Sequence, residues 1–386
     1  SPGYYTNFLP RYDVRTEVTA TPRTSMARFW FPKGKSNILL NLGEGLTNES
    51  GAMVRRVSET EYEGVKLLGT FCYNPQAVFP IYFVMRVDTK PTAAGYWKKQ
   101  RSMTGVEAEW DKDNGKYKLY TNYTKEIAGD DIGVYLNFHS RGNEPIVVRM
   151  GVSFVSMANA RENLDAEQKG KDFDTIKEEA RNAWNKDLSR IEVEGGTEDQ
   201  RTVFYTALYH ALLHPNVLQD VNGQYPTLET GEVKTMREGN RYTVFSLWDT
   251  YRTTATLQAL IAPDEASDMA QSLLLDAEQG GAYPNWSMNN VEYGVMNGYS
   301  TFPFIANLYA FGARNFDLQA TKEMMKRVSV KHIKCKGFHG WEHVEDYMTY
   351  GYVPVDRHGH GASMTLEYAI DDFSIAQICK AAGDEA

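Results

Sequence analysis

The feature that most constrains the fold of this chain is a change of hydrophobic periodicity near residue 157. Before it, short apolar runs alternate with turn residues, and the stretch Val14-Arg15-Thr16-Glu17-Val18-Thr19-Ala20 has the period of two that is typical of a half-buried strand. After it, apolar residues recur every three or four positions, as on a helix face. One sheet or one bundle cannot satisfy both patterns, so the 386 residues are predicted to form two kinds of domain.

Residues 1–156 are predicted to form a β-sandwich domain. Further strands are expected within 28–31, 38–42, 81–87, 134–138 and 146–155, each bounded by Gly, Pro, Asn or Asp. Short strands at regular spacing without intervening helices are typical of a sandwich.

Residues 157–197 are predicted to form a linker helix region. From Ala158 to about Arg190 the segment is strongly charged and carries one apolar stripe, made by Phe173, Ile176, Ala180, Ala183, Trp184 and Leu188. We expect a helix on the outside of the sandwich, ending before Gly195-Gly196.

Residues 198–386 are predicted to be a helical domain with long loops. The expected helices span about 198–214, 247–261, 264–278, 299–313, 317–329 and 363–382. Paired helices after a strand domain indicate an α/α toroid, but a six-hairpin toroid needs about twice as many. The toroid is therefore expected to be only about half present, which would expose apolar helix faces. Ser1-Pro2-Gly3 opens the chain without Met, so we expect a fragment, a processed product or a truncated chain.

Composition narrows the class of partner. The net charge of −9 argues against nucleic acid, and the absence of any run of 18 apolar residues argues against a membrane span. Aromatic residues make up 12% of the chain, and flat rings of this kind stack on sugar faces as well as in cores.

Two pairs of histidines invite a metal-site interpretation. His210 and His214 lie four residues apart on an expected helix, and His358 and His360 alternate with glycine. No glutamate lies between the first pair in the zincin pattern, so a packed helix and a flexible loop are the commoner explanations. The sequence leaves the metal ligands unknown.

A Trp-Asp pair lies where an extended segment enters a helix, at Ser246-Leu247-Trp248-Asp249-Thr250. Asp249 has two interpretations. It is either a helix cap or a carboxylate that accepts two sugar hydroxyls, with Trp248 as the apolar wall beside it.

An aromatic and amide-rich loop follows at 279–299. Asn285 and Trp286 are candidate substrate-binding residues there, because donors, acceptors and a stacking face suit a polyhydroxylated ligand. Asn also favours turns, which explains part of this composition without a ligand.

Glu367 and Asp371 are the weak candidates for catalytic residues. Four residues apart on an expected helix, they place two carboxylates on one face, and glycosidases use such pairs. A cation beside them is the alternative, with Arg357 as one source.

Taken in order, these segments resemble glycoside hydrolase family 92, the calcium-dependent exo-acting α-mannosidases. The resemblance spans essentially the whole chain and matches the middle part of the family's chain. It rests on Phe204-Tyr205-Thr206-Ala207-Leu208-Tyr209-His210, Leu213-His214-Pro215-Asn216, Ser246-Leu247-Trp248-Asp249-Thr250, Glu278-Gln279-Gly280-Gly281, Tyr350-Gly351-Tyr352-Val353-Pro354 and Thr365-Leu366-Glu367-Tyr368-Ala369.

The resemblance implies an inverting hydrolysis of terminal α-linked mannose in mannose-rich glycans, assisted by Ca²⁺. Trp248 and Asp249 match positions that line the mannose pocket of the family, and Asp249 would bind hydroxyls of the terminal mannose. It also implies a periplasmic or extracellular protein that acts in N-glycan degradation.

The departures from the family are equally specific. The general acid is expected in a Glu-Gly-Asn-Ala-Trp segment downstream of Glu367, and this chain has no such segment; Glu238-Gly239-Asn240 is followed by Arg241. We therefore expect the acid, the base and the calcium ligands outside this chain, in the remaining part of its precursor. Asn285-Trp286-Ser287 replaces a common Lys-Trp-Pro, which leaves the linkage preference open.

Three alternatives to the α-mannosidase stay open at this point. One is a non-catalytic mannose-binding module, which would keep the pocket wall without an acid and a base. The others are a phosphorylase of the same architecture, for which no phosphate-binding loop is visible, and an inert interaction module.

Overall fold

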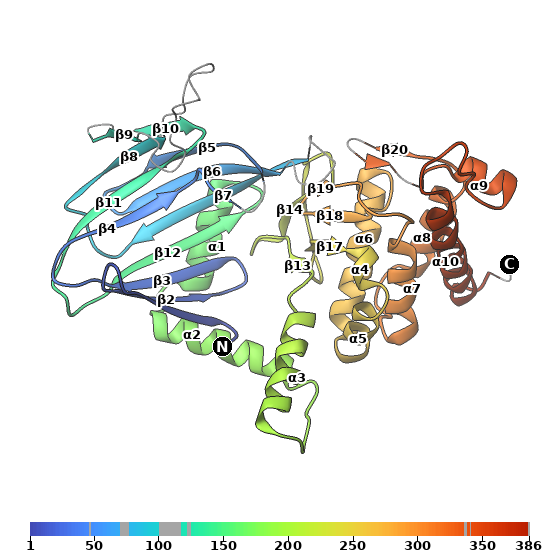
Figure 1. Ribbon diagram of the computed structural model, residues 1–386, viewed down its shortest axis with the longest axis horizontal. Helices are drawn as coiled ribbons and strands as arrows, with labels where there is room; N and C mark the ends of the chain where they lie inside the picture. The colour runs from blue at the N-terminus through green and yellow to red at the C-terminus, as the bar shows by residue number, and fades with distance from the viewer. Residues whose placement is uncertain are drawn as a thin grey trace. The chain divides into compact units, whose positions relative to one another are not determined.

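The computed structural model describes residues 1–45, 48–69, 77–99, 117–121, 125–335, 338–339 and 341–384. The chain divides into two compact units, the first built from strands and the second from helices (Figure 1). The first comprises residues 1–70, 78–187 and 220–222, and the second comprises residues 71–77, 188–219 and 223–386. The predicted order of a β-sandwich and then a helical array is confirmed.

The first unit contains two antiparallel sheets. The larger has the order β1-β2-β3-β12-β7-β6-β5-β10, with bounds Tyr4–Leu9, Val14–Ala20, Thr24–Trp30, Ile146–Ser153, Val78–Val87, Glu61–Gly69, Asn48–Arg56 and Glu126–Gly129. The smaller has the order β4-β11-β8-β9, with bounds Gly34–Asn41, Ile132–Ser140, Ala93–Lys99 and Tyr117–Tyr120.

The core of the sandwich follows from alternation along these strands. Phe83 and Met85 of β7 point to the same face and pack with Val134 and Leu136 of β11 in one buried cluster. Successive side chains of a strand point to opposite faces. Val84 accordingly lies on the other face of the larger sheet, where it packs against a helix.

Two helices, and not the single predicted linker helix, cover that other face. They are α1 (Met157–Gln168) and α2 (Phe173–Leu188). The break has a local cause: Gly170 takes a φ of 75°, and the Asp172 carboxylate accepts the Thr175 N–H at 2.8 Å and so starts the second helix. Glycine adopts this left-handed conformation without strain.

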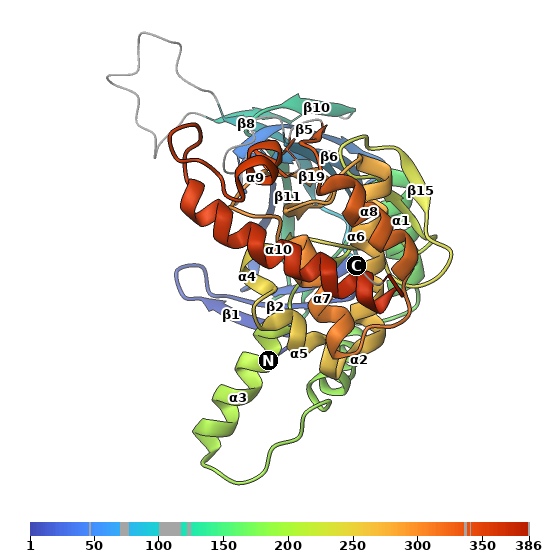
Figure 2. The same ribbon diagram turned by 90° about the vertical axis from the view of Figure 1, so that its right-hand side faces the viewer.

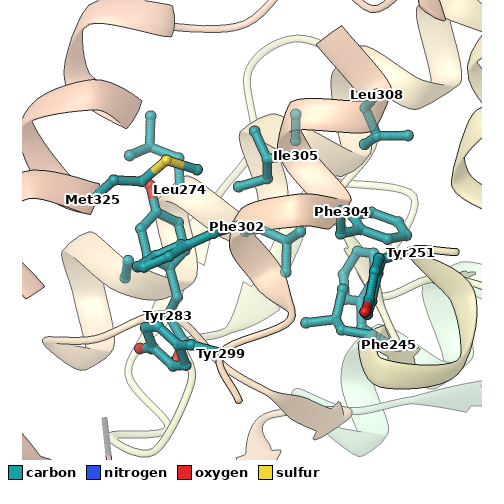
Figure 3. Close-up of a cluster of buried hydrophobic side chains, with 14 of the residues drawn as sticks. Phe245, Tyr251, Leu274, Tyr283, Tyr299, Phe302, Phe304, Ile305, Leu308 and Met325 are labelled. Atoms are coloured by element: carbon teal, nitrogen blue, oxygen red, sulfur yellow. Dashed lines mark hydrogen bonds between the residues drawn. The ribbon is translucent and has the colours of Figure 1, made fainter. Parts of the chain in front are cut away.

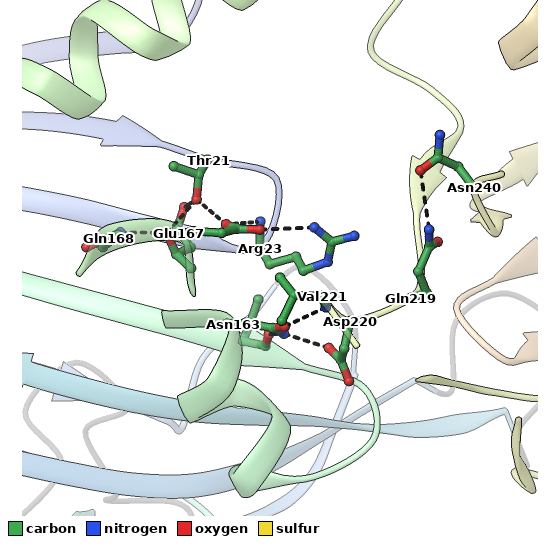
Figure 4. A network of polar contacts seen from close by, with 11 residues as sticks. Thr21, Arg23, Asn163, Glu167, Gln168, Gln219, Asp220, Val221 and Asn240 are labelled. Atoms are coloured by element: carbon green, nitrogen blue, oxygen red, sulfur yellow. Dashed lines mark hydrogen bonds and ion pairs between the residues drawn. The ribbon is translucent and has the colours of Figure 1, made fainter. Parts of the chain in front are cut away.

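A polar network ties α1 to a distant part of the chain (Figure 4). Asn163 of α1 donates from Nδ2 to the Asp220 carboxylate at 2.6 Å and accepts the Val221 N–H at 2.9 Å. Asp220 is 3% exposed. Residues 220–222 therefore belong to the first unit although the chain has already entered the second.

The second unit is an array of helices and short hairpins. Its helices are α3 (Glu198–Ala211), α4 (Leu247–Thr250), α5 (Thr254–Ile261), α6 (Pro263–Gly280), α7 (Thr301–Phe311), α8 (Leu318–Val328), α9 (Val344–Tyr350) and α10 (Gly361–Ala381). Its short strands are β13 (Asn216–Val217), β14 (Gln224–Pro226), β15 (Val233–Thr235), β16 (Tyr242–Thr243), β17 (Phe245–Ser246), β18 (Trp286–Met288), β19 (Val291–Glu292), β20 (Lys334–Cys335) and β21 (Phe338–His339).

The core of this unit is apolar and aromatic. α5, α6 and α7 pack pairwise, and α10 lies against α7 and α8 (Figure 2). Phe302 of α7 meets Tyr283 and Tyr299 edge to face, with ring centroids 5.8 and 4.8 Å apart (Figure 3). Such pairs add to the stabilisation from burial alone.

The described helices do not close into a ring, and α10 is apolar on its outer face as well as its inner one. Tyr368 is buried, whereas Leu366 and Phe373 are 70% and 66% exposed. Ile370 and Phe373 line a groove of about 720 Å³ between α7 and α10. The expected exposure of apolar helix faces is thus present. No described helix has the length and apolar character needed to cross a membrane.

Candidate functional site

The pairing of two short strands brings the Trp-Asp motif and the amide-rich loop together. β17 ends at Ser246, which pairs with Trp286 of β18. Leu247 then begins α4, so Trp248 and Asp249 leave the end of the same strand. Two motifs about 40 residues apart in sequence therefore meet at one place in the helical unit.

Asp249 is exposed and is not the cap of its helix. It is the third residue of α4, and its carboxylate accepts a hydrogen bond from the Ser246 hydroxyl. Ser246 occupies the cap position without a side-chain cap bond. An exposed carboxylate held by one hydroxyl is suited to accept hydroxyls of a ligand.

Trp248 is half-buried beneath an arginine. The Arg252 guanidinium lies 4.5 Å from the centre of the Trp248 ring and donates a hydrogen bond to the Trp248 carbonyl. The indole Nε1 is buried and has no hydrogen-bond partner in the described part of the chain. The ring thus has a fixed orientation beside Asp249.

Glu367 connects α10 to this motif. Its carboxylate accepts hydrogen bonds from Arg252 at 2.9 Å and from the Tyr251 hydroxyl at 3.2 Å. Burial, followed by the charge of Glu367, raises the pKa of Tyr251 to about 12, so Tyr251 remains a hydrogen-bond donor at neutral pH. The cation beside Glu367 is Arg252, whereas Arg357 pairs with Asp346 at 2.8 Å.

Asp371 is one turn further along α10 and is 1% exposed. It accepts the Tyr299 N–H at 2.9 Å. Burial raises the pKa of Asp371 well above its ordinary value, and the charges of Glu367 and Asp372 add to this effect. These contacts favour positioning roles for Glu367 and Asp371; their catalytic role stays a prediction.

Asn285 uses its side chain within the loop. Its Nδ2 donates to the Val295 carbonyl at 2.9 Å, and its Oδ1 accepts the Ser300 N–H at 3.1 Å. The residue is 9% exposed. Trp286 is half-buried, so of the two predicted loop residues it is the one with ring surface open to a ligand.

Glu292 binds backbone N–H groups of the 279–299 loop, a role that the sequence pattern did not predict. It is fully buried, and its carboxylate accepts the Trp286 N–H at 2.9 Å. Its position between Val291 and Tyr293 could have indicated this role, because a charged residue between two apolar ones is buried only when its charge has partners.

A small polar cavity lies beside the loop. Its volume is about 60 Å³, and its lining includes Asn285, Asn297, Glu342 and Tyr368. This space can hold water or a hydroxyl group but not a whole pyranose ring.

One histidine of each pair has another partner. His214 Nδ1 lies 2.9 Å from the Asn216 amide oxygen, and His358 Nε2 lies 2.6 Å from Asp346 Oδ2. His343 stacks on His358 with ring centres 3.6 Å apart. No three His, Cys, Asp or Glu side chains of the described residues come together in a way that could hold a metal ion. The described residues therefore do not fit the implied calcium site.

The β-sandwich is followed by a helical array in which Trp248, Asp249 and Trp286 form an aromatic and carboxylate wall, and such a wall is typical of proteins that act on carbohydrates. Residues 1–153 match the sequence model of the Glycosyl hydrolase family 92 N-terminal domain, and residues 159–386 match that of the family 92 catalytic domain. The chain belongs to glycoside hydrolase family 92.

Solved structures have the same fold. The family GH92 alpha-mannosidase BT3965 from Bacteroides thetaiotaomicron is 27% identical, with a TM-score of 0.86 over 99% of this chain and 49% of that one. The Family GH92 Inverting Mannosidase BT2199 from the same organism is 24% identical, with a TM-score of 0.85 over 100% of this chain and 49% of its own, and is similar in fold.

A curated relative is similar over a shorter part of the chain. An "Uncharacterized secreted glycosidase" from Arthroderma benhamiae is 34% identical over 107 residues, which is 26% of this chain and 13% of the relative. The chain thus spans about half of the similar solved chains and a smaller part of the curated relative.

Proposed function

We propose that this chain provides the mannose-binding wall of an exo-acting α-mannosidase that releases terminal α-linked mannose from mannose-rich glycans with inversion. The observation that carries the proposal is the pairing of Ser246 with Trp286, which assembles Trp248, Asp249 and Trp286 at one place. The BT3965 enzyme, of which this chain is a 27% identical match, has been solved in complex with mannoimidazole.

Each residue of the wall has a proposed role. The exposed Asp249 carboxylate accepts two hydroxyls of the terminal mannose, and Trp248 and Trp286 provide apolar ring surfaces beside it. Arg252 and Glu367 fix the Trp248 ring. Asn285 remains a proposed binding residue, although its amide contacts favour a role in shaping the loop.

We infer that the general acid and base come from outside this chain. An inverting glycosidase needs two carboxyl groups on opposite sides of the bond, with room for water. Glu367 is engaged by Arg252 and Tyr251, and Asp371 is buried, so neither has the freedom that this step requires. The calcium ligands are proposed to lie outside this chain as well. Bound Ca²⁺ would supply a hard cation for sugar hydroxyl oxygens.

The proposed setting is periplasmic or extracellular, in N-glycan degradation. The secreted glycosidase from Arthroderma benhamiae supports this location.

The experiment compares mannose binding by the chain and by its Asp249→Ala variant, using calorimetry. Losing a charge-assisted acceptor costs about 1.5–3 kcal/mol, so the affinity should fall about 10- to 150-fold. Asp264→Asn removes an exposed carboxylate from the first turn of α6 and should leave binding unchanged. Equal affinity for the chain and Asp249→Ala would refute the assigned wall.

Glu367 is hydrogen-bonded to Arg252 and Tyr251, and Asp371 is buried. These contacts also favour the alternative of a non-catalytic mannose-binding module. Hydrolysis of an aryl α-mannoside by this chain with calcium would exclude the alternative. Hydrolysis by the full-length protein, abolished by a calcium chelator and absent from this chain, would support the division proposed here.

A further inference from the structure

The starting observation is a buried carboxylate that accepts three backbone hydrogen bonds. Glu292 lies in β19 and is 0% exposed. Its two oxygens accept the N–H groups of Asn285 at 3.1 Å, Trp286 at 2.9 and 3.0 Å, and Gly294 at 3.0 Å. An acceptor-only group suits this set of donors, of which the Asn285 N–H belongs to a buried residue, Trp286 is half-buried and Gly294 is exposed.

These donors come from both arms of one hairpin. Asn285 and Trp286 lie at the start of β18, and Gly294 follows β19, while Ser287 pairs directly with Glu292. The carboxylate therefore closes the open end of the hairpin, beside the backbone bond from the Tyr293 N–H to the Trp286 carbonyl at 3.1 Å. The backbone N–H of Glu292 donates a hydrogen bond to Glu229 Oε1 at 2.8 Å. This bond anchors the hairpin to the loop after β14.

The position of Trp286 depends on this closure. Trp286 pairs with Ser246, and the Ser246 hydroxyl holds Asp249. A shift of the Trp286 backbone would therefore move its ring relative to Trp248 and Asp249. Glu292 itself is fully buried, so it would act on a ligand only through Trp286.

We propose that Glu292 is a positioning residue of the mannose site, whose ionised carboxylate fixes Trp286 against the Trp248-Asp249 pair. The proposal rests on the function proposed above and adds a dependence on proton concentration. Among the described residues, Glu229 is a charged group that faces Glu292 from the neighbouring loop.

The proton dependence follows from the same geometry. Burial raises the pKa of Glu292 to about 7; the three N–H groups oppose this shift, and the charge of Glu229 adds to it. Protonation converts one acceptor into an O–H donor that faces N–H groups. The hairpin is then held less firmly, so mannose affinity should fall as the pH drops from about 8 to 6.

The test uses the full chain, methyl α-mannoside as probe, and a matched pair of variants. Glu292→Gln removes the buried charge with little change of shape, and Glu232→Gln removes an exposed one from the β14–β15 loop. At pH 8 we expect Glu292→Gln to bind about tenfold more weakly and to show no change of affinity between pH 6 and 8. Glu232→Gln should keep the affinity and the pH profile of the parent chain. A Glu292→Gln chain whose mannose affinity still falls between pH 8 and 6 as that of the parent chain does would overturn the proposal.

A second measurement does not depend on mannose or on the folding of a Glu292 variant. The fluorescence difference between the parent chain and Trp286→Phe isolates Trp286, and it should change with a midpoint near pH 7. A flat difference would overturn the proposal. Absence of mannose binding by the parent chain, with the transition intact, would instead refute the proposed function and leave the positioning role standing.

Discussion

Four carboxylates in the helical unit differ in what their surroundings allow them to do. Asp249 is exposed, Glu367 forms an ion pair with Arg252, and Asp371 and Glu292 are buried. The sequence predicts Asp249 at a helix entrance, Glu292 in a loop, and Glu367 and Asp371 on one face of a helix, but it does not reveal the surroundings of these carboxylates. Those surroundings come from residues far away in sequence: Arg252 lies 115 positions from Glu367.

Asp371 should make the helical unit less stable as the pH rises. Its pKa is raised well above 3.8 in the folded chain, chiefly by burial, whereas an unfolded aspartate ionises near that value. Below pH 3.8 both states hold the proton. Above it the unfolded state loses its proton first, so stability falls until the pH passes the pKa of the folded state.

We expect Asp371→Asn to remove this slope, because an amide oxygen can still accept the Tyr299 N–H. Urea unfolding from pH 4 to 8 should show a gain over the parent chain that grows by up to about 1.4 kcal/mol per pH unit. Asp356→Asn, at an exposed site, should show no such trend. A constant difference between Asp371→Asn and the parent chain would contradict this prediction.

The candidate site was predictable in part from its residues. The residue types of Trp248, Asp249 and Trp286 predict sugar binding, which stays a prediction, and the β17–β18 pairing brings the three residues to one place. No sequence pattern indicates that the Asn285 amide is hydrogen-bonded to the Val295 carbonyl and the Ser300 N–H. A side chain that suits a ligand equally suits backbone groups, and only the fold decides between them.

At the scale of elements, strand and helix types followed from periodicity, but their ends depended on local contacts. β2 spans Val14–Ala20 as predicted. The helix expected over 247–261 is broken, because Thr253 takes φ −143° and ψ −40°, outside the helical region. The short α9 was not predicted; its seven residues carry too little periodic pattern to stand out from the surrounding loop.

Residues 297–299 pack closely against α10, and this packing can be tested by substitution. Gly298 has φ +84°, and a Cβ there would lie 2.5 Å from the Cβ of Glu367. On either side, Asn297 bonds Ser363 and Tyr299 bonds Asp371, so the segment cannot move away without breaking these bonds.

Gly298→Ala should therefore lower the free energy of unfolding by about 1–3 kcal/mol. It should also weaken mannose binding, because Glu367 would lose its alignment with Arg252. Gly359→Ala is the matched control, since a Cβ there has no atom within 4 Å. Denaturant unfolding of both variants tests the point, and equal stability would show that α10 accommodates the methyl group.

For the whole molecule, periodicity predicted the change from strands to helices but not the path of the chain. The strand unit runs to Asp187 and then regains residues 220–222 after a stretch that belongs to the helical unit. Periodicity reports which face of an element is buried and carries no information about a single buried side chain in a loop. Asp220 is such a residue, lying in a turn between short strands.

Asp220 is expected to stabilise the strand unit, to which residues 220–222 belong. The Asp220 carboxylate accepts hydrogen bonds from Ser153 at 2.7 Å, Asn159 at 2.8 Å and Asn163 at 2.6 Å, and so joins β12 to α1. Asp220→Ala leaves these donors buried without their acceptor, at a cost of about 1–3 kcal/mol for each that water cannot reach.

We expect Asp220→Ala to reduce hydrogen-exchange protection in β12 and α1 while amides of α6 and α7 keep theirs. Asp220→Asn retains one acceptor oxygen and should have a smaller effect at the same amides. Uniform loss of protection across both units would show that they open together. Unchanged protection in α1 would mean that apolar packing of Val84 against Ala160 and Leu164 holds this helix without Asp220.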